Sequence, residues 1–143
     1  MQKFKFKYES IKKVKDLLEK KVQKEIAQIN LEIERNILEK EKLIREIENN
    51  FKNRKSNKVS ELKAVENYKT ALEKKIEMIQ KQIVSLNKRK ADKVNELLEK
   101  SKENKIFQTL EENHFESFKY EENLKDESKI NEIATQKYIR NKN

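Results

Sequence analysis

The chain has 143 residues, of which 43% are charged, and its formal net charge is +9. It contains no glycine, no proline and no cysteine. Because glycine and proline supply most sharp turns and helix stops, this composition excludes glycine-rich nucleotide-binding loops and most compact enzymes, and the missing cysteine excludes disulfides. We expect an all-α protein, a long antiparallel two-helix coiled-coil hairpin that forms a single domain over residues 1–143.

A first helix is predicted over about residues 4–51. Apolar residues recur there every three or four positions, with a mean step of about 3.64, between the 3.5 of a left-handed supercoil and the 3.67 of a right-handed one. This spacing predicts one nearly straight helix with a single apolar stripe. The stripe contains Ile11, Val14, Leu18, Val22, Ile26, Ile29, Ile33, Ile37, Ile44, Ile47 and Phe51.

A reversal is predicted over about residues 52–60, where the apolar spacing lapses and no acidic residue occurs between Glu48 and Glu61. Asparagine and serine compete with helical hydrogen bonds, and asparagine tolerates a left-handed backbone. The residues of this type are Asn49, Asn50, Asn53, Ser56 and Asn57.

A second, longer helix is predicted over about residues 61–140, with its C-terminal part as an overhang. The Asn-rich turn places the N-terminal helix beside the stretch near Lys90, rather than beside the acidic stretch 110–133. A turn near Tyr68 would pair the oppositely charged ends better. We keep the Asn-rich turn because its backbone argument is local, whereas exposed charge pairs contribute only about 0–1 kcal/mol each. The thin seam also predicts that the ends fray in the isolated protein and become ordered on binding.

Catalytic and metal-binding constellations are not expected. His114 is the single histidine, whereas structural zinc sites need sets of cysteine and histidine. The carboxylates lie on a solvated helix without an enclosed pocket that would tune them for acid–base chemistry. We therefore expect no enzyme activity, no metal and no cofactor.

Two basic runs, 52–58 and 88–93, have two interpretations. They could contact nucleic acid phosphates, or they could be solvated turn and helix surface. Because aromatic residues for base stacking are not interleaved with these lysines, we favour the solvated surface.

The N-terminus alternates Phe4, Phe6 and Tyr8 with lysines before the helical spacing begins at Ile11. Such aromatic residues can cap the open end of a hairpin, or they can anchor the chain in a partner. The sequence leaves both interpretations open.

The stretch MQKFKFKYESIKKVKDLLEKK resembles the start of the flagellar export protein FliJ family, which opens with an aromatic-x-aromatic element before a helix of this type. At the other end, EENLKDESKINEIATQKYIR is similar to the family's acidic-aliphatic-alanine element near a basic tail, here Glu132, Ile133 and Ala134 before Arg140. The segment ENYKTALEKKI, with Tyr68 and Leu72, is similar to the family's restart after the turn.

The resemblance implies a non-enzymatic coiled-coil stalk of the flagellar type III protein export apparatus, needed for motility. Its implied partners are the export ATPase hexamer, whose assembly and ATP hydrolysis it promotes, the cytoplasmic domain of the export gate, and export chaperones. The implied location is the cytoplasm, peripherally at the inner face of the cell membrane at the flagellar base.

Two candidate sites follow from the stalk interpretation, one at each end of the hairpin. The open end is the expected ATPase contact, with Phe4, Phe6, Tyr8, Ile11, Phe115, Phe118 and Tyr138. The turn end is the expected gate contact, with Ile47, Phe51, Tyr68 and Leu72.

Other interpretations remain open from the sequence. They are a generic coiled-coil scaffold, the related stalk of a virulence type III secretion system, a basic coiled coil that binds nucleic acid, and an intrinsically disordered chain. Salt-dependent affinity would distinguish the nucleic acid binder, and a weak helical circular dichroism spectrum would distinguish the disordered chain.

Overall fold

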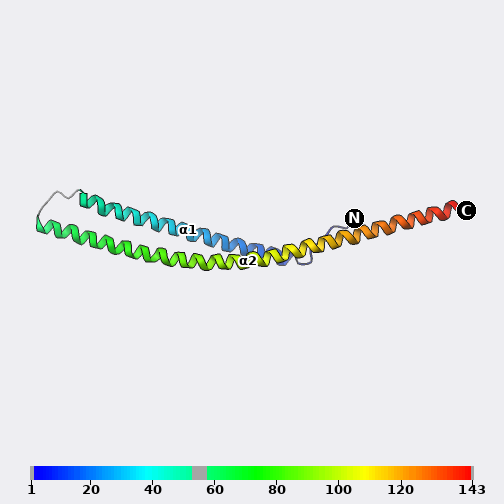
Figure 1. Cartoon of the computed structure of the whole chain (residues 1–143), viewed down its shortest axis with the longest axis horizontal. Helices are drawn as coiled ribbons and strands as arrows, with labels where there is room; N and C mark the ends of the chain where they lie inside the picture. The colour runs from blue at the N-terminus through cyan, green and yellow to red at the C-terminus, as the bar shows by residue number, and fades with distance from the viewer. Residues whose placement is uncertain (1, 53–57, 143) are drawn as a thin grey trace. The chain divides into compact units, whose positions relative to one another are not determined.

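The computed structural model describes residues 2–52 and 58–142, and both helices predicted from the sequence are present (Figure 1). Helix α1 runs over Glu9–Lys52 and helix α2 over Val59–Lys142. The all-α hairpin with a longer second helix is therefore confirmed. The predicted turn residues Asn53, Ser56 and Asn57 lie outside the described residues.

Helix α1 begins at Glu9, later than the predicted start near residue 4. Its first turn is closed by the Lys12 amide, which donates to the Tyr8 carbonyl at 2.9 Å. Residues two apart point to nearly opposite sides of a helix but to the same side of an extended chain. An irregular segment before Glu9 therefore lets Phe4 and Phe6 turn toward the same neighbour, which a helix from residue 4 would prevent.

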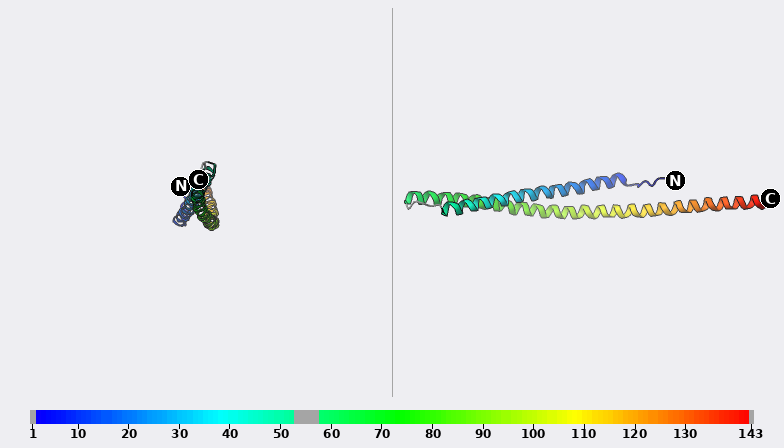
Figure 2. Two further views of the ribbon diagram at one scale, coloured as in Figure 1. Left: turned by 90° about the vertical axis from the view of Figure 1, so that its left-hand side faces the viewer. Right: turned by 90° about the horizontal axis from the view of Figure 1, so that it is seen from above.

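The described contacts divide the chain into two compact units, and both helices contribute to each. The first comprises residues 1–18 and 99–143, and the second comprises residues 19–98. In the second unit, Glu25 pairs with Lys93 and Lys40 with Gln80. A residue later in α1 therefore pairs with a residue earlier in α2. The helices of this unit are therefore antiparallel neighbours (Figures 1 and 2).

The seam of the second unit has a strict heptad spacing. Its buried residues in α1 are Val22, Ile29 and Leu43, and its buried residues in α2 are Leu72 and Ile83. Partly or fully covered positions alternate by three and four residues along both helices, which is the 3.5-residue period of a left-handed coiled coil.

The predicted 3.64-residue stripe in α1 is therefore wrong in part. Asn36 and Leu43 occupy the seam, whereas Ile37 and Ile44 are exposed. A helix that keeps one face toward a single partner helix needs a 3.5-residue repeat. Residues spaced by 3.64 positions rotate gradually away from that contact. Ile37 and Ile44 consequently lie beside the seam rather than in it.

The first unit differs from the prediction at the start of α1. Ile11, Val14 and Leu18 are exposed, although the sequence predicted them in the seam. Lys12 and Lys15 are partly covered instead, and they pair with Glu111 and Glu103 of α2. These ion pairs and the packing of Phe6 hold α1 in a rotation that turns its aliphatic residues outward.

The C-terminal part of α2 has no covered residues. Every described residue after Glu122 is exposed, up to Lys142. This segment agrees with the overhang predicted from the sequence. Burial of side chains supplies most helix stability in proteins. Because this segment has no such burial, its helix depends on helix propensity and on local pairs within the helix.

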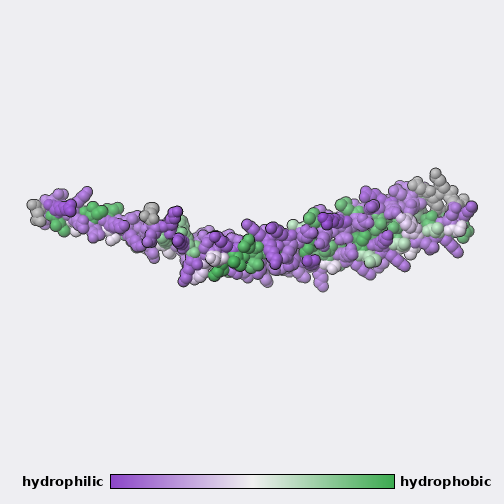
Figure 3. Space-filling model, turned by 180° about the vertical axis from the view of Figure 1, so that it is seen from behind, coloured by the Kyte–Doolittle hydropathy of each residue, from purple (hydrophilic) through white to green (hydrophobic). Residues whose placement is uncertain are grey.

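On the face shown in Figure 3, hydrophilic side chains dominate and apolar residues form separate patches among them. In the described part of the chain, neither helix contains a stretch long and apolar enough to cross a membrane. The apolar patches therefore identify the places where a partner could gain binding energy from burial.

Candidate functional site

An aromatic cluster joins the N-terminal segment to α2 in the first unit. The Phe4 ring lies 5.2 Å from the Phe115 ring and 5.5 Å from the Phe118 ring, measured between centroids. Phe6 is buried and lies 5.6 Å from His114. We call these residues, together with Tyr8 and Phe107, the aromatic clasp.

Tyr8 completes the clasp. Its ring lies 5.8 Å from Phe6, 6.2 Å from His114 and 6.4 Å from Phe107. The Phe6 contacts and the Tyr8–Phe107 contact are edge-to-face, a favoured arrangement worth about 0.5–1.5 kcal/mol per pair beyond the buried area. The clasp therefore holds a segment without regular structure against α2.

Ion pairs continue the clasp along α1. Lys12 donates a hydrogen bond to Glu111, and this bond raises the pKa of the Lys12 ammonium. The Lys15 ammonium donates to Glu103 at 2.8 Å, and this hydrogen bond lowers the pKa of the Glu103 carboxyl. The Lys15 nitrogen also lies 5.5 Å from the centroid of Phe107, so Lys15 links the ion pair to the aromatic ring.

The structure brings together five of the seven residues expected at the open end. Phe4, Phe6, Tyr8, Phe115 and Phe118 all belong to the clasp, which is the internal cap that the sequence left open as one interpretation.

The other two residues expected at the open end have no ring contact with the clasp. Ile11 is exposed on α1, and Tyr138 is exposed in the C-terminal part of α2. Phe115 remains 39% exposed despite its contact with Phe4, so an apolar surface is still available there.

Sequence reasoning missed Phe107 and His114 as members of this cluster. Phe107 contacts Tyr8 and Lys15, and His114 contacts Phe6 and Tyr8, at positions separated by seven residues in α2. That heptad spacing is the signal that could have identified them, since it places both residues on the face that packs against the first helix.

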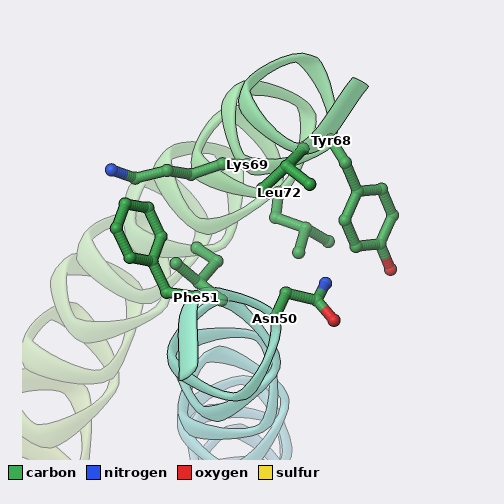
Figure 4. Close-up of a pocket in the computed structure, with 7 residues that line it drawn as sticks. Asn50, Phe51, Tyr68, Lys69 and Leu72 are labelled. Atoms are coloured by element: carbon green, nitrogen blue, oxygen red, sulfur yellow. The ribbon is translucent and has the colours of Figure 1, made fainter. Parts of the chain in front are cut away.

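All four residues expected at the turn end line one small depression in the second unit (Figure 4). Leu72 is buried at this site, whereas Phe51 and Tyr68 are exposed. Ile47 is the fourth expected residue, and the lining residues that the sequence analysis missed are Asn50, Val65 and Lys69.

Polar contacts position the aromatic residues of this depression. The Lys69 nitrogen lies 4.8 Å from the Phe51 ring centroid, within cation–π range. The Tyr68 hydroxyl donates to the Glu46 carboxylate, and this hydrogen bond raises the pKa of Tyr68. Apolar faces of Phe51 and Tyr68 therefore lie beside a buried leucine at the rim of the coiled coil.

The described residues contain no metal-ligand group. Over residues 2–52 and 58–142, no group of three or more histidine, aspartate or glutamate side chains could hold a metal ion.

Comparison with known proteins identifies the family. No curated protein and no solved structure matches the chain. A family model described as "Flagellar FliJ protein" matches residues 4–143. This match includes the clasp, the turn-end depression and the exposed end of α2. The chain therefore belongs to the flagellar FliJ protein family and is a component of the flagellar export apparatus.

Proposed function

We propose that the chain is the coiled-coil stalk of the flagellar export ATPase. It binds the ring that the ATPase forms, and it promotes the assembly of that ring and its ATP hydrolysis. It also links the ATPase to the export gate and to export chaperones, and it works at the inner face of the membrane. The family match over residues 4–143 carries this proposal.

The cross-section of the second unit supports a stalk. Two helices side by side are about 20 Å wide, because each helix with its side chains is about 10–12 Å across. The seam is heptad-spaced and its buried residues are aliphatic, so the pair is held along its length without a third helix. Such a pair is narrow enough to enter the central opening of a ring.

We assign the ATPase contact to the exposed ring of Phe115 in the first unit. The buried Phe6 holds the N-terminal segment on α2, while Phe115 keeps part of its ring exposed beside it. In this arrangement the clasp positions the contact, and the exposed ring of Phe115 makes it. The turn-end depression with Phe51 and Tyr68 is then available for the export gate.

The first experiment mixes the purified chain with its cognate flagellar export ATPase and measures ATP hydrolysis together with ring formation. We expect stimulation at a near-stoichiometric ratio. If hydrolysis and ring formation are unchanged while both proteins are folded, the stalk proposal is refuted.

Two matched phenylalanine variants locate the contact. Phe115 and Phe51 are 39% and 46% exposed, and each has a lysine nitrogen 4.8 Å from its ring centroid. Phe115→Ala should weaken ATPase stimulation, whereas Phe51→Ala should leave it intact and weaken binding to the gate's cytoplasmic domain. The opposite pattern would reverse the two assignments.

A double variant tests the clasp itself. Phe4→Ala with Phe6→Ala should weaken ATPase stimulation while helicity is retained, because both residues precede the start of α1 at Glu9. Unchanged stimulation would show that the open end does not contact the ATPase.

A further inference from the structure

The first turns of α1 present aliphatic side chains to solvent. Lys12 and Lys15 take the positions that face α2, where they pair with glutamates. The aliphatic residues are consequently turned away from the seam, and they are Ile11, Val14, Leu17 and Leu18, with exposed fractions of 46%, 55%, 66% and 39%. A coiled coil gains less from apolar residues in these positions than from residues in the seam, since much of each side chain stays in solvent.

Exposed lysines precede these aliphatic residues in the sequence and lie among them. In the irregular N-terminal segment, Phe4 and Phe6 contact α2, whereas Lys3, Lys5 and Lys7 are exposed. Lys13 is also exposed in α1. Over residues 2–18, Glu9 is the one exposed acidic residue against these four exposed lysines.

We propose that this surface, the exposed lysines and aliphatic residues of 2–18, docks the chain directly on an anionic lipid bilayer. The aliphatic side chains enter the boundary between headgroups and acyl chains, and the lysines remain among the anionic headgroups. A helix with an aliphatic face and basic flanks binds membranes in this way, through buried apolar area and attraction to anionic lipid.

The residue types favour lipid over a protein partner. Strong protein contacts rely on tryptophan, tyrosine and arginine. Here, the first arginine is Arg35, and Tyr8 is engaged in the clasp. Lysine acts as a point charge without the fixed geometry of arginine, which suits a diffuse layer of headgroups better than a specific carboxylate.

This inference does not depend on the stalk proposal. It concerns a lipid partner and residues that precede the second unit, whereas the stalk proposal concerns the ATPase and the exposed ring of Phe115. A failure of one experiment therefore leaves the other informative.

The test is co-sedimentation of the full chain with vesicles of phosphatidylcholine, with and without phosphatidylglycerol. We expect binding only when phosphatidylglycerol is present, and binding that falls as salt is added. Two variants probe the surface: a lysine variant with Lys3, Lys5 and Lys7 changed to Gln, and an aliphatic variant that combines Val14→Ser with Leu17→Ser.

The expected effects follow from known increments. One lysine near an anionic surface contributes about fivefold in partitioning, so the lysine variant should lose about 100-fold. The aliphatic variant should lose about tenfold or more. Circular dichroism should remain helical in both, because the lysines precede α1 and the two aliphatic residues are exposed.

Two control variants test whether the loss of vesicle binding is specific to this surface. They remove the same charge, or aliphatic residues of similar exposure, from other parts of the chain. A variant with Lys63, Lys74 and Lys75 changed to Gln removes the same charge from exposed positions of α2. Leu38→Ser with Val84→Ser removes a leucine and a valine that are 61% and 60% exposed. Both controls should bind phosphatidylglycerol vesicles like the unmodified chain.

Three outcomes would overturn the proposal. The first is no binding to phosphatidylglycerol vesicles. The second is an equal loss in the control variants, which would show that net charge alone drives binding. The third is that the aliphatic variant binds vesicles normally but fails to stimulate the export ATPase, which would make this surface a protein interface.

Discussion

Replacement of Ile29 by alanine tests whether the heptad seam holds the second unit together. Ile29 has an exposed fraction of 2% and is the most buried large side chain described. The change removes three carbon atoms, a loss of about 2.4 kcal/mol at about 0.8 kcal/mol each. The higher helix propensity of alanine returns about 0.4 kcal/mol. The free energy of unfolding should therefore fall by about 2 kcal/mol.

This value lies at the low end of the range for large-to-small changes in protein cores, about 2–5 kcal/mol. A two-helix seam is open on two sides, so neighbouring side chains and water can close around the gap. In thermal unfolding followed by circular dichroism, a chain of this length should lose about 4–8 °C in melting temperature.

The matched control is Leu38→Ala on the same helix, where the side chain is 61% exposed. Its effect should stay within about 0.5 kcal/mol, as for most surface substitutions. If Ile29→Ala costs no more than Leu38→Ala, the two helices are not held by this seam in solution.

Other predictions concern the polar contacts of the second unit. The hydrogen bond from Lys93 lowers the pKa of Glu25. The stability that this pair contributes is therefore complete above the ordinary carboxyl pKa of 4.5 and is lost as the pH falls below it. A series of melting temperatures measured at acid pH would detect this loss. Asn36 occupies a seam position, and among the described hydrogen bonds it donates only to the Glu32 carbonyl of its own helix. Asn36→Leu should therefore raise the free energy of unfolding in urea by about 1 kcal/mol. A decrease would show that Asn36 fixes the register of the two helices. The hydrogen bond to Glu46 raises the pKa of Tyr68 above its ordinary value of 10.0. In an ultraviolet titration, the Tyr68→Phe variant should therefore lack one late-ionising phenol that the unmodified chain shows.

The hairpin was predictable because its physical basis is local. Apolar residues every three or four positions indicate helices, and a chain without glycine or proline has few places to stop one. The lapse in this spacing after Phe51 separated the two helices in the sequence. The structure accordingly ends α1 at Lys52 and begins α2 at Val59.

The rotation of α1 at its N-terminal end was not predictable in the same way. Ile11 and Val14 satisfy helical spacing as well as Lys12 and Lys15 do, so the spacing alone cannot choose which pair faces α2. The choice depends on glutamates about a hundred positions away, which pair with the lysines. Such long-range pairing is invisible in a window of neighbouring residues.

The aromatic clasp was predicted in composition but not in arrangement. Phe4 and Phe6 were recognisable from their alternation with lysines, whereas the contact of Phe6 with His114 depends on the register of the two helices. A single histidine on a polar helix gives no sign of such a contact. The seven-residue interval from Phe107 to His114 was the available clue, and it requires the heptad phase of α2 to be known first.

The exposed end of α2 has a consequence for how this protein tolerates mutation. Side chains after Glu122 are exposed and so contribute little to the chain's own packing, and most substitutions there should leave the fold intact. Selection on these positions would then act through partners rather than through folding. A scan of motility over residues 123–142 would therefore map a binding surface directly, without the loss-of-folding background that complicates such scans in a protein core.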